Sequence, residues 1–360
     1  MPPEPPREIG SEYHWDPAAL LDPERGGLPG WLPARRELFA TGCGALSALL
    51  RLLAPAGRLH VPTYFCMGVA ETLAHQAPIA WYRHLPDRRG PHWETLRVTG
   101  GDVVLAQNLF GRDDGTAWDA WMRAHPDVTV IEDHSHDPFS TWACASTAAY
   151  AVASLRKTLP LPDGGLLWSP RGLDLPEPSG ATSAGADLKL AAMLLKAAWL
   201  EGRPVPKDRF RALQQQGEHQ LLGSAAPASA FTAAMLALLD INGVRAASAR
   251  NGAEVEAALA GRTPDGFEIL GGGGFRVQLT CPSAGARDEL LAFLAGNRIF
   301  APVHWRQDRS GFWSGDREAA DLGDRMLTLP VDHRCGPGDL RRIAEVVNTG
   351  SHGSLSGHMI

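Results

Sequence analysis

The sequence contains very little lysine. Of its 34 lysine and arginine residues only four are lysines, at positions 157, 189, 196 and 207. An amine differs from a guanidinium because its pKa shifts readily on burial, which suits it to covalent chemistry. In a chain that otherwise uses arginine, each lysine is therefore a candidate for a specific role.

Paired cysteines and basic blocks are also absent. The five cysteines are an odd number and form no C-x-x-C pair, which predicts reduced thiols in a cytoplasmic protein rather than a disulfide framework. The net charge of -6 and the pI near 6.1 come without any basic run. This composition argues against nucleic acid or an anionic membrane as a partner.

No apolar run is long enough for a membrane span. The longest, 188–200, is short and is interrupted by Lys189 and Lys196. The proline-rich segment 1–6 lacks the apolar core of a secretory signal. With 360 residues, 44% of them hydrophobic, the chain can bury a large core, and we expect one large domain with a smaller one.

Short apolar segments alternate with helical patterns in the first half of the chain. Strands are predicted at 58–61, 79–82, 102–106 and 128–132, with two more inside 148–168. Helices are predicted at 45–53, where Thr41 is a suitable N-cap, and near 66–76 and 116–125. This alternation is typical of an α/β fold with a large, mostly parallel sheet covered on both faces.

The second half has a different pattern. Helices are predicted at 187–201 and at 227–261, the latter with a break near 242–243. After the glycine run 271–274 come strands at 275–280, 298–303 and 326–329 and helices at 286–296 and 337–348. We predict an N-terminal arm (1–35), a large domain (36–240), a small C-terminal α+β domain (241–349) and a disordered tail (350–360).

Lys157 follows a predicted strand that ends near Ser154, and the glycine pair Gly164-Gly165 opens the next strand. A pyridoxal-phosphate (PLP) enzyme of the aspartate aminotransferase type needs this arrangement. Its lysine amine condenses with the cofactor aldehyde, a hydroxyl binds the phosphate, and glycines let the backbone pass close to the ring. The other three lysines are predicted at ordinary solvated positions.

Two further segments fit the same cofactor. Asp133 ends a predicted strand, where its carboxylate could pair with the pyridine nitrogen, and His136 follows three residues later. Gly42, Cys43 and Gly44 stand at a predicted helix N-terminus, where free N–H groups bind anions. The acidic and histidine-rich run 132–137 also permits a metal-hydrolase interpretation, although its spacing does not match an H-x-H-x-D-H hydrolase pattern and we predict no metal site.

Together these segments resemble the DegT/DnrJ/EryC1/StrS family of sugar aminotransferases. Residues 41–46 (TGCGAL) stand where the family has its phosphate turn, and 61–66 (VPTYFC) resembles its segment beside the cofactor ring. Residues 131–136 (IEDHSH) and 154–165 resemble the family's acidic segment and its lysine segment. Residues 299–305 and 327–332 resemble its substrate-proximal loop and its last conserved strand.

The resemblance implies a PLP-dependent transferase fold of type I and a role for each matching residue. Lys157 would be the Schiff-base lysine, and Asp133 would lie at the pyridine nitrogen. The expected cofactor-binding residues are Gly42, Cys43, Gly44, Tyr64, Cys66, Asp133, His136, Ser154 and Lys157. His304 and Arg306, with Tyr64, are the residues expected to bind substrate.

Two departures from the family pattern keep alternatives open. The serine and lysine are three residues apart rather than five, and the N-Y-R segment that reaches the neighbouring subunit is replaced near 223–227. We expect a homodimeric aminotransferase of a biosynthetic pathway that moves an amino group from an amino acid, glutamate first, to a keto acceptor such as a keto-sugar or cyclitol. A PLP-dependent lyase, racemase or bond-forming enzyme, or a non-catalytic homologue, is the alternative.

Overall fold

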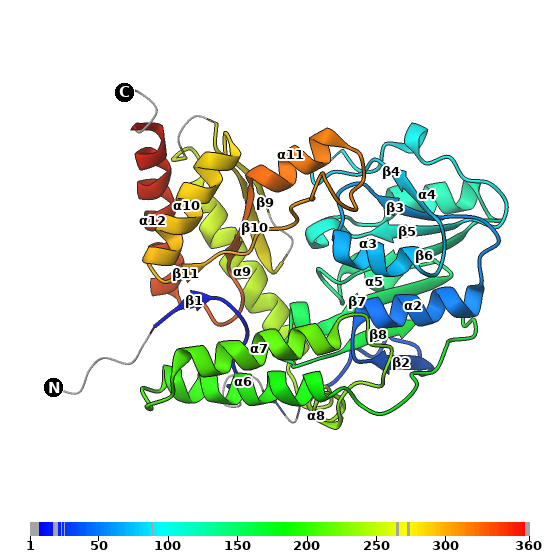
Figure 1. Cartoon of the computed structure of the whole chain (residues 1–360), viewed down its shortest axis with the longest axis horizontal. Coiled ribbons are helices and arrows are strands. Elements are labelled where there is room, and N and C mark those ends of the chain that lie inside the picture. Colours follow the sequence, from blue (N-terminus) through cyan, green and yellow to red (C-terminus); the bar gives the residue numbers. More distant parts are fainter. Residues whose placement is uncertain are drawn as a thin grey trace.

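The structure, a computed structural model, describes residues 7–16, 21–22, 24, 26–87, 89–263, 266–271 and 274–356. A large body built on a seven-stranded sheet lies beside a smaller body that carries the C-terminus (Figure 1). A pair of antiparallel helices lies along the lower edge of both. The predicted α/β class with a large, mostly parallel sheet is confirmed.

The large sheet is built from short, buried strands. They are β2 (Arg36–Phe39), β3 (Leu59–Pro62), β4 (Ile79–Tyr82), β5 (Val103–Gln107), β6 (Thr129–Asp133), β7 (Tyr150–Ser154) and β8 (Gly165–Trp168). Their order is β2-β8-β7-β6-β5-β3-β4. The five strands from β7 to β4 run parallel, while β8 is antiparallel to β7 and β2 to β8.

Helices cover both faces of this sheet. They include α2 (Gly42–Leu53), α3 (Met67–Ala74), α4 (Thr116–Ala124) and α5 (Thr141–Ala145). Successive strand residues point to opposite faces. Leu105 of β5 accordingly belongs to the core cluster of α2 and α3, and its neighbour Val104 to the cluster of Trp118 and Trp142. Burial on both faces explains the continuous apolar runs seen in the sequence.

The smaller body packs helices against an antiparallel sheet. It consists of α9 (Ile241–Leu259), β9 (Glu268–Gly271), β10 (Arg276–Thr280), α10 (Ala284–Gly296), β11 (Ile299–Phe300), α11 (Arg317–Arg325), β12 (Met326–Pro330) and α12 (Pro337–Ser356). The strand order is β12-β10-β9. The N-terminal β1 (Ile9–Gly10) pairs in parallel with β11, so part of the predicted arm is a strand of this body.

The two helices at the lower edge show that the prediction of solvated positions for Lys189 and Lys196 was wrong. They are α6 (Ala184–Leu200) and α7 (Lys207–Leu221), and α7 was not predicted. Lys189 and Lys196 on α6 are buried rather than solvated, because the N-terminal segment and α7 supply carboxylates to them. Lys196 pairs with Glu8 at 3.0 Å and Lys189 with Glu218 at 2.7 Å.

Two helix predictions differ in their limits. The helix expected at 227–261 is two helices, α8 (Ala230–Met235) and α9, and the break comes before Asp240, whose side chain caps α9 by accepting from the N–H of Gly243. The last helix runs to Ser356, into the tail predicted to be disordered. Ser351 is fully buried there and donates to the carbonyl of Val347. Residues 357–360 of that tail lie outside the described residues.

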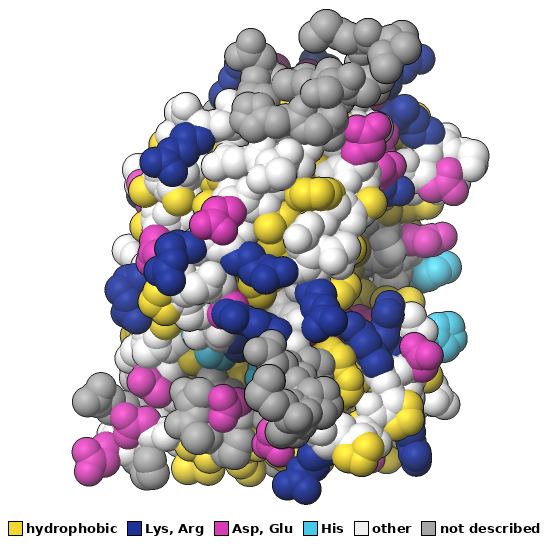
Figure 2. Space-filling model, turned by 90° about the vertical axis from the view of Figure 1, so that its left-hand side faces the viewer, with side chains coloured by type: hydrophobic (Ala, Val, Ile, Leu, Met, Phe, Trp, Pro, Cys, Tyr) yellow, Lys and Arg dark blue, Asp and Glu magenta, His cyan; other side chains and the backbone are white. Residues whose placement is uncertain are grey.

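The surface that carries α12 has an uneven charge distribution. Lys and Arg side chains gather in a band across its middle, with Asp and Glu scattered around them (Figure 2). Across the described segments, no helix is both long and apolar enough to cross a membrane.

Candidate active site

The N-terminus of α2 forms a narrow turn beside Ser154. The Thr41 hydroxyl caps the helix by accepting from the N–H of Gly44 at 2.9 Å, as the sequence predicts. A Cβ added to Gly44 would lie 1.8 Å from the carbonyl oxygen of Ser224, and one added to Gly42 would lie 3.3 Å from Cβ of Ser154. The turn therefore requires glycine, and it presents backbone N–H groups next to a hydroxyl.

The glycine pair after Lys157 serves the same close packing. Gly164 has φ of +125°, a conformation that disfavours other residues, and a Cβ on Gly165 would lie 2.2 Å from the carbonyl carbon of Thr41. The absence of a side chain at Gly165 lets β8 approach the start of α2. The expected proximity of the phosphate-turn segment and the lysine segment is thus present.

Parallel neighbours β6 and β7 end at the same edge of the sheet, and this brings Asp133 and Ser154 together. Asp133 is buried, and its Oδ1 accepts from the N–H of Ser135 at 2.9 Å. Ser135 Oγ in turn accepts from the N–H of Ser154 at 2.9 Å. Among the described residues, Asp133 Oδ2 and Ser154 Oγ have no hydrogen-bond partner.

Lys157 ends the 3₁₀ turn Leu155–Lys157 that follows β7. Its Nζ forms no hydrogen bond or ion pair within the described parts of the chain and lies 5.8 Å from the centre of the Trp305 ring. Burial lowers the pKa of this amine, against the opposing effect of the nearby Asp133 and Cys66. The lowered pKa favours the neutral, nucleophilic amine.

Arg276 connects the smaller body to the lysine turn. Its guanidinium donates to the carbonyl of Lys157 at 2.9 Å and to the carbonyl of His136 at 3.3 Å. Burial lowers its pKa from the ordinary arginine value. Sequence reasoning missed this residue, because thirty arginines gave no local signal for one that contacts a distant loop.

His136 lies in an aromatic stack next to the lysine turn. Its ring stacks on Phe110 at 5.0 Å and on Trp305 at 5.3 Å, and Nδ1 accepts from the N–H of Phe110 at 2.8 Å. Burial holds the pKa of His136 well below its usual range, so the ring is neutral. The sequence analysis named His136 and included Trp305 in the segment 299–305, but it did not name Phe110.

Tyr64 and His304 lie at the far side of this stack. Tyr64 is fully buried, and its hydroxyl donates to the carbonyl of His304. The rings of Tyr64 and Trp305 are 5.7 Å apart. Nδ1 of His304 lies 2.8 Å from Oγ1 of Thr328, and burial keeps its pKa well below the usual range. Both residues therefore contact the Trp305 ring, which in turn lies next to Lys157.

The two thiols predicted at the site are near the lysine. Burial raises the pKa of Cys43 to about 11, and the charges of Cys66, Lys157 and Asp133 also act on it. Cys66 is the residue before α3 and influences the pKa of Lys157. Cys43, Cys66, Asp133 and Lys157 thus form one electrostatically connected group.

Arg306, predicted to bind substrate, is not part of this group. It is about half exposed and pairs with Asp288 at 2.5 Å. In the run 132–137, Glu132 pairs with His134 at 2.9 Å and Asp137 with Arg245 at 2.8 Å. Within the described ranges, no group of three or more His, Cys, Asp or Glu side chains is placed to hold a metal.

An open cavity of about 820 Å³ leads to Lys157. Its walls are α7, the N-terminal residues 8–13 and the segment 300–302. A smaller cavity of about 110 Å³ on the other side of Tyr13 is lined by Lys157, Arg276 and Thr328. The lysine is therefore partly buried and reachable from solvent.

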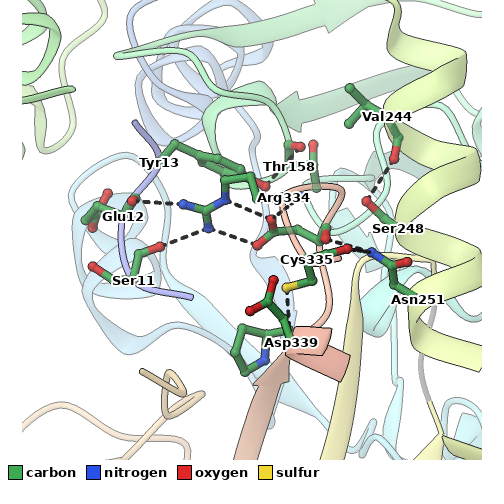
Figure 3. Close-up of polar contacts among 12 residues, drawn as sticks. Ser11, Glu12, Tyr13, Thr158, Val244, Ser248, Asn251, Arg334, Cys335 and Asp339 are labelled. Atoms are coloured by element: carbon green, nitrogen blue, oxygen red, sulfur yellow. Dashed lines mark hydrogen bonds and ion pairs between the residues drawn. The ribbon is translucent and has the colours of Figure 1, made fainter. Parts of the chain in front are cut away.

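The N-terminal wall of the cavity is fastened by Arg334 (Figure 3). Its guanidinium donates to the carbonyls of Ser11 and Glu12, pairs with Asp332 at 2.8 Å and lies 4.3 Å from the centre of the Tyr13 ring. The Tyr13 hydroxyl donates to the carbonyl of Thr158 at 3.1 Å. We call residues 9–15 the N-terminal strap, because they connect β11, Arg334 and the lysine turn.

Solved structures resemble this fold over nearly the whole chain. A Streptococcus pneumoniae protein assigned as a sugar aminotransferase, Spr1654 in its PMP form, aligns with a TM-score of 0.64 and 15% identity over 90% of this chain and 88% of that one. The 3-amino-5-hydroxybenzoic acid synthase aligns with a TM-score of 0.64 and 15% identity over 97% and 100%. A DegT DnrJ EryC1 StrS aminotransferase from Brucella abortus aligns with a TM-score of 0.57 and 15% identity over 88% and 85%.

The chain has the fold of these aminotransferases. The type I fold that the sequence resemblance implies is confirmed by the structural comparison. No protein-family model and no curated protein sequence matches the chain. The similarity is therefore one of architecture at very low sequence identity, and activity has to be argued from the site.

Proposed function

We propose that this protein is a PLP-dependent aminotransferase in which Lys157 carries the cofactor. The observation that supports it best is a set of three groups, Lys157 Nζ, Asp133 Oδ2 and Ser154 Oγ. They meet at one sheet edge without hydrogen-bond partners in the described structure. An amine, a carboxylate oxygen and a hydroxyl that are not bonded to one another or to neighbouring described residues suit a group with an aldehyde, a basic nitrogen and a phosphate.

The surrounding residues fit the cofactor's other requirements. The Gly42–Gly44 turn and Ser154 would hold the phosphate, since the turn has no space for side chains and offers free N–H groups. Asp133 would pair with the ring nitrogen. Cys66 would border the ring. Tyr64 and His136 both contact the Trp305 side chain, and they would border the cofactor ring through it. When bound, the cofactor supplies an electron sink for carbanion chemistry.

Lys157 has two tasks in this proposal. Its neutral amine is the nucleophile that binds the cofactor aldehyde, and the same Nζ then takes up and returns the proton that moves during amino transfer. The lowered pKa suits both tasks because it keeps the amine unprotonated over more of the neutral range. Arg276 holds the lysine turn in place through the Lys157 carbonyl.

The finer assignments follow from the resemblance rather than from contacts. We propose an amino-acid donor, glutamate first, and a keto acceptor of the keto-sugar or cyclitol type. DesI, a structure determined in the presence of its TDP-sugar product, aligns with a TM-score of 0.62 and 16% identity over 99% of this chain and 94% of that one. We also propose a cytoplasmic homodimer with domain limits near residues 36 and 241.

The first test is the visible spectrum of the protein after PLP addition and desalting. We expect a yellow chromophore in the wild type and none in Lys157→Ala. Borohydride reduction and peptide mapping should place the adduct on Lys157 and not on Lys189, Lys196 or Lys207. Glutamate should then convert the chromophore and release 2-oxoglutarate. A colourless wild type without an adduct contradicts the proposal, and a chromophore that no amino acid converts contradicts transamination.

A further inference from the structure

Strand β5 ends in a polar residue on the same side of the sheet as the cofactor site. Gln107, its last residue, is the register partner of Asp133 on β6. Asp133 pairs in turn with Val152, which lies two residues before Ser154 on β7. Leu105 and Val152 both pack in the core cluster of α2, and strand side chains alternate between the two faces. Gln107, Asp133 and Ser154 therefore form one row across three strand ends, on the face that carries α2.

The amide oxygen of Gln107 is a buried acceptor without a donor. The residue is only 2% exposed, and Oε1 has no hydrogen-bond partner in the described chain. The next residue, Asn108, is equally buried but satisfied. Its Oδ1 accepts from the N–H of Asp113 at 3.2 Å, and its Nδ2 donates to Ser140 Oγ at 3.3 Å. An acceptor removed from water without a donor costs free energy, so a bound group that donates to it gains affinity.

The proposed cofactor has a donor on the side that faces Gln107. In PLP the two carbons next to the aldehyde-bearing carbon carry the phosphate arm and the ring hydroxyl, so these groups lie on opposite sides of the ring. Strands β7, β6 and β5 are consecutive in the sheet. With the phosphate at Ser154 on β7 and the ring nitrogen at Asp133 on β6, the phosphate side of the ring faces β7. The hydroxyl side then faces β5 and Gln107.

Two other residues of the site are less suited to accept from that hydroxyl. The carboxylate of Asp133 would be taken by the ring nitrogen. Nδ1 of His136 already accepts from the N–H of Phe110, so the neutral imidazole has its proton on Nε2 and offers a donor there. The amide oxygen of Gln107 supplies the acceptor.

We propose that Gln107 is a cofactor-binding residue whose Oε1 accepts a hydrogen bond from the ring hydroxyl. The inference deepens the proposed function and rests on it for the presence and direction of the ring. Three neighbouring strands then hold the ring at three different groups, β7 at the phosphate, β6 at the nitrogen and β5 at the hydroxyl. The contact makes the site selective for pyridine aldehydes that carry this hydroxyl.

Two probes test the contact, PLP and its analogue with hydrogen in place of the ring hydroxyl. Their affinities for the apoprotein are measured by quenching of tryptophan fluorescence. We expect the wild type to bind PLP more tightly than the analogue. Gln107→Leu should reduce this preference about fivefold, about 1 kcal/mol, because leucine cannot accept a hydrogen bond. Gln107→Met, which has a flexible side chain of similar volume, should reduce it in the same way.

Gln278→Leu is the matched control. Gln278 is also a buried strand glutamine, but it lies on β10 and its Oε1 accepts from Arg112. This variant should keep the wild-type preference for PLP and unfold at a lower denaturant concentration. The two Gln107 variants, as apoproteins, should unfold at the wild-type concentration or above it, because Oε1 loses no partner in the described chain.

Three results would overturn the proposal. They are an unchanged preference for PLP in the Gln107 variants, an equal loss of preference in Gln278→Leu, or a loss of apoprotein stability in both Gln107 variants, which would reveal a structural role for the amide. The spectrum at Lys157 is recorded in parallel. A wild type that forms no chromophore with PLP refutes the proposed function, whereas a normal chromophore with an unchanged preference refutes only the role of Gln107.

Discussion

At the scale of single residues, the site depends on side chains that have unusually few partners. Lys157 is reachable from a cavity but has no acceptor for its amine in the described chain, and its only described ring contact is with Trp305. Its pKa is lowered mainly because burial disfavours the ammonium form. This electrostatic state has a consequence that can be measured.

We expect uptake of PLP by the apoprotein to follow the neutral fraction of Lys157. Because the pKa is lowered, the neutral fraction of Lys157 at a given pH exceeds that of a free lysine, whose pKa is near 10.4. The rate of chromophore formation should therefore rise with pH and level off below the pH at which a free lysine would. Stopped-flow absorbance across pH 6 to 11 measures it. A midpoint at the ordinary lysine pKa would contradict the lowered value.

The residues that sequence reasoning missed share a physical origin. Asp133, Ser154, Lys157 and the glycine turn follow local strand and helix patterns, so the order of elements was enough to predict them. Arg276 and Phe110 enter the site through contacts between segments more than a hundred residues apart. Contacts between such distant segments cannot be predicted from a local sequence pattern.

At the scale of elements, the strands of the large sheet were predicted except β2 (Arg36–Phe39), and the helices around the sheet were less predictable. The buried strands have continuous apolar runs bounded by turns, which identifies them in isolation. Helix α7 has few apolar residues and follows Pro204 and Pro206, so its sequence gives little helical periodicity. Packing against α6 stabilises α7, and the sequence of α7 alone does not indicate that contact.

The start of α2 is the element whose geometry is most constrained. Gly44→Ala should destabilise the protein by roughly 1–3 kcal/mol, because the new Cβ would lie 1.8 Å from the Ser224 carbonyl oxygen and force a shift. We also expect weaker retention of PLP after desalting. Denaturant unfolding and the visible spectrum measure the two effects.

Gly68→Ala in α3 is the matched control for this substitution. Nothing lies within 4 Å of a Cβ at that position, so alanine should leave stability unchanged or raise it. Equal behaviour of the two variants would show that the turn at Gly44 is not tightly packed.

At the scale of the whole molecule, the N-terminal strap unites the two bodies around the lysine turn. Arg334→Met should lower the free energy of unfolding by roughly 3–5 kcal/mol, because it leaves the Asp332 carboxylate buried without its partner. It also removes the donors to Ser11 and Glu12. Limited proteolysis should then cut the strap before the remaining chain unfolds.

Arg309→Met provides the comparison for the strap. Arg309 pairs with Asp321 and Asp324 at a site where its side chain is nearly half exposed, so its loss should change stability by less than about 1 kcal/mol. The strap should stay resistant to protease in this variant. Early cleavage in both variants would mean that Arg334 does not hold the strap.

The strap also sets an order of events during synthesis. Residues 9–13 are synthesised about three hundred residues before β11 and Arg334, which fix them. The large sheet can form meanwhile, since its strands all precede residue 169. One wall of the cavity beside Lys157 is therefore assembled last, and a nascent chain that stops short of residue 334 would have its lysine turn in place with that side of the cavity still unbuilt.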